Sequence, residues 1–398
     1  MDIQPIRWLP RQPPPAREDV PIFAYLLLKL ATRCNLDCSY CYWFRDPTVY
    51  EKPRLLSAQV SAALCANLER HIDRYGLDEF TVLLHGGEPL LLGKRRFEEF
   101  MLELDGVAER TGARIVRLLS TNGVLVDDDW ARLFLRFGVH ASVSIDGPEA
   151  IHDARRKDFR GQGSHARAVR GLEVLRSHGV DVGAIAVCDP ATDSAEVARY
   201  LAGSLGVRRF DILPPDATHE DHRAPIAPYF IRLFDEWRGG LGAEGVDIRF
   251  LSGVVRGLLG RSTGTDSIGF GPIHTVTVQT DGSLEALDVL RIAGNEVTQT
   301  RRNVFDDELQ SVAQDANWLR AYDASLQLPA ACRDCDLREA CGGGHLAHRW
   351  SRERGYDNPS VYCEDYKAIF GHVWRALLPS LELVSGGGAR TPLQRALN

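Results

Sequence analysis

The sequence predicts an α/β fold, a partial (β/α)6 barrel followed by a C-terminal cysteine-rich extension. Between residues 22 and 213, short apolar runs typical of buried strands alternate with longer amphipathic stretches typical of helices. Each of the five helical stretches ends just before a glycine, the residue that most easily adopts the left-handed conformation that closes a helix. Such alternation predicts parallel strands covered by helices, and six units indicate an open or partial barrel.

The expected elements follow in chain order. The strands are Tyr25–Ala31, Phe80–Leu84, Ile115–Ser120, Val139–Ile145, Val180–Val187 and Arg209–Leu213. The helices between them are Leu56–Tyr75, Arg95–Thr111, Asp127–Phe137, His165–His178 and Ser194–Leu205. The pattern changes after Pro214-Pro215, where we expect helices at Tyr229–Arg238 and Gly253–Leu259, and a hairpin over Thr275–Leu287 with Asp281-Gly282 as its turn.

These patterns divide the chain into five expected parts. They are an N-terminal segment (1–21), the partial barrel (22–215), a helical connector (216–264), a cysteine-rich domain (265–375) and a C-terminal tail (376–398). The stretch Cys332–Cys363 lacks the periodicity of a self-sufficient core, so a bound metal would help it to hold its shape.

Composition restricts the class of partner. The net charge of −7 gives no reason to expect a nucleic acid or an anionic membrane as partner. No secretory signal is visible, and the strongest apolar run, Ile22–Ala31, contains Lys29 and is too short to span a bilayer. We therefore expect a cytoplasmic protein, in which clustered cysteines bind metal rather than form disulfides.

Three of the nine cysteines, Cys34, Cys38 and Cys41, lie within eight residues directly after the first expected strand. A structural zinc site is closed by four ligands, whereas a reactive site keeps an open position. A 4Fe–4S cluster held by three cysteines leaves one iron open for a substrate or cofactor. An unrelated zinc loop is the alternative for this group.

Polar motifs stand where three further strands are expected to end. The second strand leads into His85-Gly86-Gly87-Glu88-Pro89, the third ends in Ser120-Thr121-Asn122-Gly123, and the fourth ends in Ser144-Ile145-Asp146-Gly147-Pro148. Two glycines allow a backbone to approach a ligand closely, and Glu88 offers an acceptor for an ammonium group. Ligands of open α/β sheets lie beyond the carboxyl ends of the strands, so these motifs are expected to share one site.

The CxxxCxxC spacing with Tyr40 before its last cysteine, together with these motifs, resembles the radical S-adenosylmethionine (SAM) superfamily. In that family SAM chelates the open iron, and an electron from the cluster splits it into methionine and a 5′-deoxyadenosyl radical, which removes a hydrogen atom from the substrate. Resemblance to sulfatase-maturase-like members implies that Glu88 grips the SAM amino group and that Ser144 and Arg156 hold its carboxylate, with Arg155 as an alternative. The full set of SAM contacts implied is Tyr40, Gly86, Gly87, Glu88, Pro89, Ser120, Asn122, Ser144, Asp146 and Arg156.

A second group, Cys332, Cys335, Cys341 and Cys363, resembles the SPASM extension of peptide- and protein-modifying radical SAM enzymes. The resemblance implies one auxiliary 4Fe–4S cluster held by these four thiolates, and a zinc knuckle is the alternative. Such extensions usually hold one more cluster, but Leu287 and His345 stand where two of its cysteines would be, so we expect that cluster to be absent. His345 is then expected to be structural or to face the substrate.

Asp288 follows directly on Leu287. Resemblance to sulfatase-maturase-like members implies that Asp288 acts as a general base, since proton removal needs a carboxylate within reach of the substrate. The alternative is a surface carboxylate paired with Arg291.

The stretches Tyr42–Asp46 and Cys341–Cys363 resemble the FxsB-like maturases and their cyclophane-forming relatives, which join an aromatic ring carbon to a β-carbon in a ribosomally made precursor peptide. This implies a precursor peptide as substrate and a flavodoxin- or ferredoxin-like protein as reducing partner. Another peptide or protein modification (a thioether crosslink, an epimerisation or a sulfatase-type oxidation) stays open, as does a non-enzymatic zinc protein.

Overall fold

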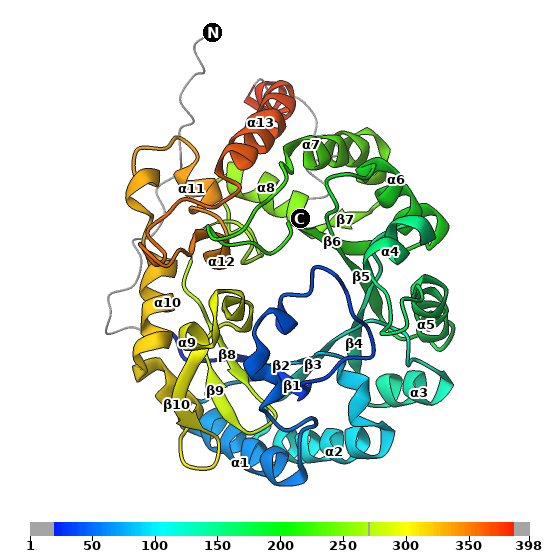
Figure 1. Cartoon of the computed structure of the whole chain (residues 1–398), viewed down its shortest axis with the longest axis vertical. Helices are drawn as coiled ribbons and strands as arrows, with labels where there is room; N and C mark the ends of the chain where they lie inside the picture. Colours follow the sequence, from blue (N-terminus) through cyan, green and yellow to red (C-terminus); the bar gives the residue numbers. More distant parts are fainter. Residues whose placement is uncertain (1–19, 270, 386–398) are drawn as a thin grey trace.

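The computed structural model describes residues 20–269 and 271–385, so most of the expected segment 1–21 and the last part of the expected tail lie outside the described residues. Ten strands form one sheet in the order β10-β9-β8-β1-β2-β3-β4-β5-β6-β7. The curled sheet lies at the centre of the molecule, and helices surround it (Figure 1). The expected α/β fold with a barrel-like sheet is confirmed.

Seven strands run parallel from one edge of the sheet, and three more complete the other edge. The parallel series is β1 (Tyr25–Ala31), β2 (Glu79–Gly86), β3 (Arg114–Thr121), β4 (Val139–Ser144), β5 (Val182–Val187), β6 (Arg209–Leu213) and β7 (Asp247–Ile248). The others are β8 (Thr275–Val278), which is parallel to β1, and the antiparallel β9 (Ser283–Glu285) and β10 (Gln299–Asn303).

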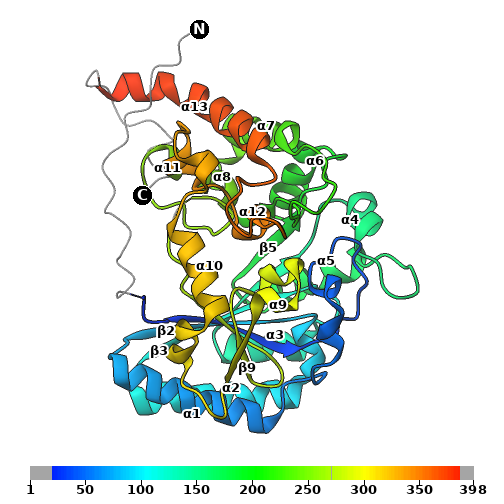
Figure 2. The same ribbon diagram turned by 60° about the vertical axis from the view of Figure 1, so that its left-hand side comes forward.

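Helices connect the strands and then form the C-terminal part. The first six are α1 (Ala58–Tyr75), α2 (Lys94–Thr111), α3 (Asp128–Arg136), α4 (Glu149–Arg155), α5 (His165–Ser177) and α6 (Ser194–Arg199). The later ones are α7 (Ala227–Glu236), α8 (Arg249–Leu258), α9 (Asn295–Thr298), α10 (Ala316–Leu326), α11 (Arg338–Cys341), α12 (Leu346–Arg349) and α13 (Cys363–Ser385). Figure 2 shows α13 and α7 at one end of the molecule and α1 and α2 at the other.

The six expected strands and the five expected barrel helices are all present, with ends that differ by a few residues. The glycines after the five helices all have positive φ angles, as expected for helix-closing residues. The sequence did not predict α4, nor that the expected hairpin joins the barrel sheet. Its strand β8 pairs with β1 from Tyr25↔Thr275 to Leu28↔Val278. This pairing satisfies backbone groups that an edge strand would otherwise expose.

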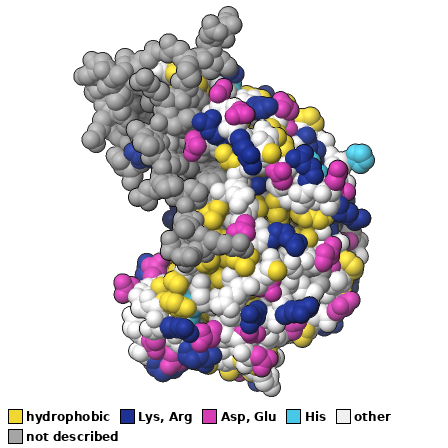
Figure 3. Space-filling model, turned by 90° about the vertical axis from the view of Figure 1, so that its left-hand side faces the viewer, with side chains coloured by type: hydrophobic (Ala, Val, Ile, Leu, Met, Phe, Trp, Pro, Cys, Tyr) yellow, Lys and Arg dark blue, Asp and Glu magenta, His cyan; other side chains and the backbone are white. Residues whose placement is uncertain are grey.

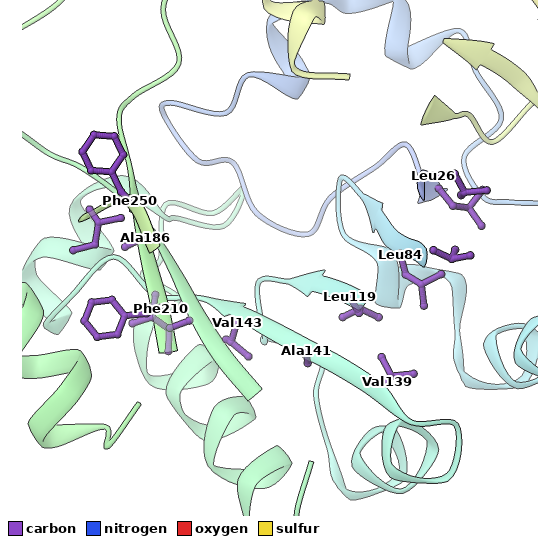
Figure 4. Packing of buried hydrophobic residues seen from close by; sticks show 14 of the residues in the cluster. Leu26, Leu84, Leu119, Val139, Ala141, Val143, Ala186, Phe210 and Phe250 are labelled. Atoms are coloured by element: carbon purple, nitrogen blue, oxygen red, sulfur yellow. The ribbon is translucent and has the colours of Figure 1, made fainter. Parts of the chain in front are cut away.

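The hydrophobic core lies between the sheet and its outer helices, because alternate residues of each strand point to opposite faces. Leu26, Leu28 and Leu30 of β1 are fully buried in this core. Figure 4 shows core side chains from β1 to β6 arranged along the sheet, with Phe250 of α8 continuing the cluster. The intervening residues, including Lys29, face the inside of the barrel, where polar groups gather.

Basic and acidic side chains are interspersed over the described part of the surface shown in Figure 3. Within the described ranges, no helix combines the length and the apolar character needed to cross a membrane. The division of the chain into five parts stays a prediction.

Candidate functional site

The loop of the first cysteine group lies at the carboxyl ends of the barrel strands, directly after β1 (Figure 1). Cys34, Cys38 and Cys41 are half-buried, and none forms a disulfide. Burial and the neighbouring Glu88 raise the pKa of Cys34 to about 12, and burial raises the pKa of Cys38 to about 11. Charge on the neighbouring thiols adds to both shifts. Three poorly solvated thiolates at this spacing need a cationic centre to stay ionised, so the donor set fits an iron–sulfur cluster.

Two glycines of β2 and the turn after it allow this loop to approach. A Cβ on Gly86 would lie 2.5 Å from the Ala31 carbonyl oxygen, and one on Gly87 would lie 2.4 Å from that of Arg33. The Gly87 amide donates to Ala31 O at 2.8 Å. The structure gives a physical reason for both glycines, which is that the cysteine loop packs against their backbone. The approach of a ligand to these glycines stays a prediction.

Glu88 is buried beside this loop and connects β2 to β3. Its carboxylate accepts hydrogen bonds from Leu90 N (3.0 Å), Thr121 Oγ1 (2.8 Å) and Asn122 N (2.8 Å). Pro89 starts the short helix that Glu88 caps. Burial raises the pKa of Glu88 to about 7 despite these hydrogen bonds. An ammonium group placed beside it would therefore favour its ionised form.

Asp146, after β4, binds two other expected SAM contacts. Arg156 donates to its carboxylate from Nε (2.8 Å) and Nη2 (3.1 Å), and the Tyr40 hydroxyl donates at 2.5 Å. The Arg156 fork thus has a carboxylate partner within the chain, which the sequence did not predict. Ser144 and Ser120 lie half-buried at the ends of β4 and β3, on the same side of the sheet.

A cavity of about 250 Å³ opens next to these residues. Tyr40, Asp146 and Arg155 line it from the barrel, and Asp216 and Tyr362 line it from the C-terminal part. The cavity lies between the expected SAM site and the C-terminal helices.

Asp288 lies in a buried polar cluster on the inner side of β1 and β2. Its Oδ2 accepts from Lys29 Nζ and from the Tyr42 hydroxyl, both at 2.6 Å. Lys29 pairs in register with His85, and its Nζ lies 3.1 Å from His85 Nδ1. The alternative of a surface carboxylate is wrong, since Asp288 is 4% exposed and pairs with Lys29. Arg291 instead forms buried ion pairs with Asp46 and Glu285.

The charges in this cluster are set by Lys29. Burial alone would raise the pKa of Asp288, but the Lys29 ammonium and the Tyr42 hydroxyl lower it to about 2. Burial and the same ammonium lower the pKa of His85 to about 3. Asp288 is therefore ionised and His85 neutral near pH 7. A carboxylate with this low pKa is a weak base, able to accept a proton from a strongly acidic donor.

The second cysteine group gathers around one small cavity. Cys332, Cys335, Cys341 and Cys363 all line it, and they come from the segments around α11 and the start of α13. Burial raises the pKa of Cys332 to about 11 and that of Cys341 to about 12, with the neighbouring thiols adding to both shifts. Four converging sulfurs can ligate all the irons of a cluster, so this donor set fits the expected auxiliary 4Fe–4S cluster.

Sequence reasoning assigned no role to several residues that the structure places here. Lys29 interrupts an apolar run, and a lysine inside a buried strand needs a counter-charge, which is the signal that could have predicted its ion pair. Tyr42 carries no such signal in the sequence. His348 lies three residues after His345, which is the spacing that places two side chains on one helical face.

Residues 28–201 match the model of the Radical SAM superfamily. This segment is a radical SAM domain. Together with the sulfatase-maturating relatives described next, this match indicates an oxidoreductase-type enzyme whose cofactors are SAM and a 4Fe–4S cluster.

Two curated relatives span most of the chain. The serine-type anaerobic sulfatase-maturating enzyme of Klebsiella pneumoniae is 27% identical over 358 residues, covering 86% of this chain and 85% of that enzyme. The cysteine-type anaerobic sulfatase-maturating enzyme of Clostridium perfringens (strain 13 / Type A) is 24% identical over 387 residues, covering 90% of this chain and 98% of that enzyme. The chain is thus related to both types along nearly its whole length.

Solved structures share the fold. Native anSMEcpe with bound AdoMet and Cp18Cys peptide superposes with a TM-score of 0.78 at 22% identity, covering 90% of this chain and 99% of that one. Streptococcus suis SuiB bound to precursor peptide SuiA gives a TM-score of 0.61 at 14% identity, covering 86% and 76%. The radical SAM barrel of this chain and its C-terminal extension therefore follow an architecture found in these proteins.

Proposed function

We propose that this enzyme oxidises the β-carbon of a side chain in a peptide or protein substrate. The observation that carries the proposal is Asp288, an ionised carboxylate held by Lys29 and Tyr42 next to the first cysteine loop. Tyr42 directly follows Cys41, so the loop of the expected cluster also carries a hydrogen-bond donor to the proton acceptor Asp288. The names of the relatives support a peptide substrate, since two are sulfatase-maturating enzymes and two solved structures hold a peptide.

The cysteines are assigned by their grouping. Cys34, Cys38 and Cys41 would hold the cluster that binds SAM, and Cys332, Cys335, Cys341 and Cys363 would hold one auxiliary cluster. When bound, SAM and its cluster would supply a 5′-deoxyadenosyl radical that takes a hydrogen atom from the substrate. The auxiliary cluster would supply a site that takes one electron. A flavodoxin- or ferredoxin-like protein is proposed as the source of the starting electron.

The remaining steps belong to the chain's own residues. Glu88 would hold the SAM ammonium group, and Arg156, fixed by Asp146, would place its guanidinium near the SAM carboxylate together with Ser144. Asp288 takes the proton that the substrate loses. Loss of one hydrogen atom, one proton and one electron removes two hydrogens from the substrate. This balances an aldehyde formed from a serine or a new carbon–carbon bond. From a cysteine it gives a thioaldehyde, which water converts to the aldehyde with release of hydrogen sulfide. A substrate oxidised by one electron is strongly acidic, so a weak base suffices.

Two products fit this scheme. Sulfatase-type oxidation of a serine or cysteine side chain to an aldehyde is favoured by the two relatives that match along most of the chain. A crosslink between an aromatic ring carbon and a β-carbon is the second candidate. It is favoured by the stretch Cys341–Cys363, which resembles cyclophane-forming maturases, and by Leu287 and His345, which replace cysteines of the other auxiliary cluster.

The experiment uses the full chain, reconstituted anaerobically with iron and sulfide and supplied with SAM and dithionite. Two synthetic peptides are compared: one carries a single serine or cysteine, and the other carries an aromatic residue with neither. Loss of two hydrogens from a serine, together with capture by hydroxylamine, identifies the aldehyde. The same mass loss without capture, in fragments that stay joined across the aromatic residue, identifies the crosslink.

Asp288→Asn removes the proposed proton acceptor. We expect it to release 5′-deoxyadenosine but to yield no modified peptide, whereas the exposed Asp306→Asn behaves as the wild type. Full product formation by Asp288→Asn would contradict the role of Asp288. SAM consumption with both peptides unchanged would count against a peptide substrate of either kind.

A further inference from the structure

Three side chains that the proposed reaction does not use converge at the edge of the cavity. Asp216 follows β6, His345 precedes α12, and His348 lies within α12. One potential ligand atom from each lies within 4.8 Å of the other two. Nitrogen and oxygen ligands bind Zn²⁺ at about 2.0–2.2 Å, so two ligands of one ion can lie about 4 Å apart. Only a small inward shift would bring all three onto one ion.

His348 points to a missing partner. It is 1% exposed, and neither ring nitrogen makes a hydrogen bond among the described residues. The Pro215 carbonyl lies beside the ring without reaching hydrogen-bond geometry. A buried imidazole with both nitrogens unsatisfied is unfavourable. A metal-bound histidine, by contrast, uses one nitrogen for the ion and directs the other to a group such as a backbone carbonyl.

The backbone holds these side chains in place. His345 follows three glycines with positive φ angles. A Cβ on Gly344 would lie 2.7 Å from Ser360 Cβ, so the backbone before His345 packs closely against the residues around Ser360. The loop carrying Asp216 is anchored on both sides. The Tyr362 hydroxyl donates to Pro215 O at 3.0 Å, and His219 N donates to Trp350 O at 3.0 Å.

The surrounding charge favours a cation. Asp266 Oδ2 lies 3.9 Å from His345 Nε2, and Asp288 lies close enough to Asp216 to influence its charge. Arg45 is also near Asp216, but it forms an ion pair with Asp221. The rings of His345 and His348 lie edge to face with centroids 5.2 Å apart.

We propose that Asp216, His345 and His348 bind one divalent first-row transition-metal ion, such as Zn²⁺ or Fe²⁺. Two imidazoles and one carboxylate form a donor set typical of such ions, and three protein ligands leave coordination positions open. Asp216 also lines the cavity that reaches Tyr40 and Asp146. The open positions can therefore take an oxygen of a molecule in that cavity. The site does not depend on the proposed peptide reaction.

The test uses the full chain with its clusters reconstituted anaerobically, so that the cysteines do not compete for zinc, and without SAM or peptide. Zn²⁺ is added alone, weakly bound metal is removed by desalting, and zinc per chain is measured by mass spectrometry. Zinc K-edge X-ray absorption then identifies the ligands. We expect one zinc per chain with nitrogen and oxygen ligands. Absence of retained zinc, or sulfur ligands in the spectrum, would overturn the proposal.

Variants separate this site from incidental binding. We expect His345→Ala and Asp216→Asn to weaken zinc binding by at least about tenfold. The matched control, His178→Ala, removes a histidine that pairs with Asp128 outside this cluster and should keep the zinc. Iron content per chain shows whether each variant has folded. Because His345 and Asp216 are less enclosed than His348, the two variants are suited to this test. Equal zinc retention by wild type and both variants would also overturn the proposal.

Discussion

The two cysteine groups of this chain differ in what surrounds them. The first group, on the loop after β1, has charged and polar neighbours at the mouth of the barrel: Glu88, Arg156 and Asn122 all lie against it. The second group lines a small cavity of its own, where Gly343, Pro359 and Tyr366 lie beside two basic side chains, Arg338 and Lys367.

The difference follows from the number of ligands. Three sulfurs leave a cluster with one open iron, so the surroundings must recognise a second molecule, and charged groups do this. Four sulfurs leave no open iron, so no second molecule has to be bound there. On the proposed assignment, the first group would serve chemistry with a bound partner, and the second would hold a group that exchanges electrons.

The largest expected effect comes from breaking the first group. Cys38→Ala should lower the iron content from about eight to about four per chain. It should also reduce formation of 5′-deoxyadenosine to background, because the iron that binds SAM is lost. Cys65→Ala, a buried cysteine of α1 outside both groups, is the matched control and should leave both quantities unchanged. Retention of about eight irons by Cys38→Ala would contradict the three-cysteine assignment.

Breaking the second group should separate two activities. Cys363→Ala should also lower the iron content to about four per chain, but dithionite should still drive SAM cleavage because the first group is intact. Modified peptide should be lost, since no site accepts the electron from the substrate. The measurements are iron content, 5′-deoxyadenosine and peptide mass. A variant that still makes the product at the wild-type rate would show that the second group has no role in electron transfer.

The variant Lys29→Met tests the buried ion pair between Lys29 and Asp288 beside the first cysteine group. It leaves the buried Asp288 carboxylate without its counter-ion, which should lower the free energy of unfolding by about 3 kcal/mol. The double variant Lys29→Met with Asp288→Asn should recover part of this loss, because no unpaired charge remains. Denaturant unfolding of the four proteins gives the coupling between the two residues. Purely additive losses would mean that the pair does not act as an ion pair.

The smallest expected effect concerns Glu88 and pH. Its folded-state pKa of about 7 lies above the unfolded value, so the folded protein binds the extra proton and loses stability as pH rises from about 4.5 to about 7. SAM's ammonium group needs the ionised form, so SAM affinity should fall up to about tenfold between about pH 7.5 and about pH 6. Glu88→Gln should bind SAM more weakly at both pH values and without this dependence. Equilibrium dialysis under anaerobic conditions measures the SAM affinity at the two pH values.

The sequence predicted the six strands of the barrel and both cysteine groups because these depend on local patterns. Apolar periodicity, helix-closing glycines and cysteine spacing are all readable within a few residues. The partners of Lys29 and Arg156 were not predicted. Lys29 meets Asp288 across 259 residues of chain, and nothing near either residue indicates such a pairing. The approach of the Ala31–Cys34 backbone to Gly86 and Gly87 was not predicted either, and the role of these glycines in binding a ligand stays a prediction.

The pairing of β1 with β8 has a consequence for synthesis of the chain. A ribosome releases β1 long before it makes Thr275–Val278, so one edge of the first strand stays unpaired during most of translation. An open strand edge can associate with other chains. Lys29 likewise meets its counter-ion only after residue 288 has been made. The final surroundings of the first cysteine loop therefore form only when more than two thirds of the chain has been synthesised.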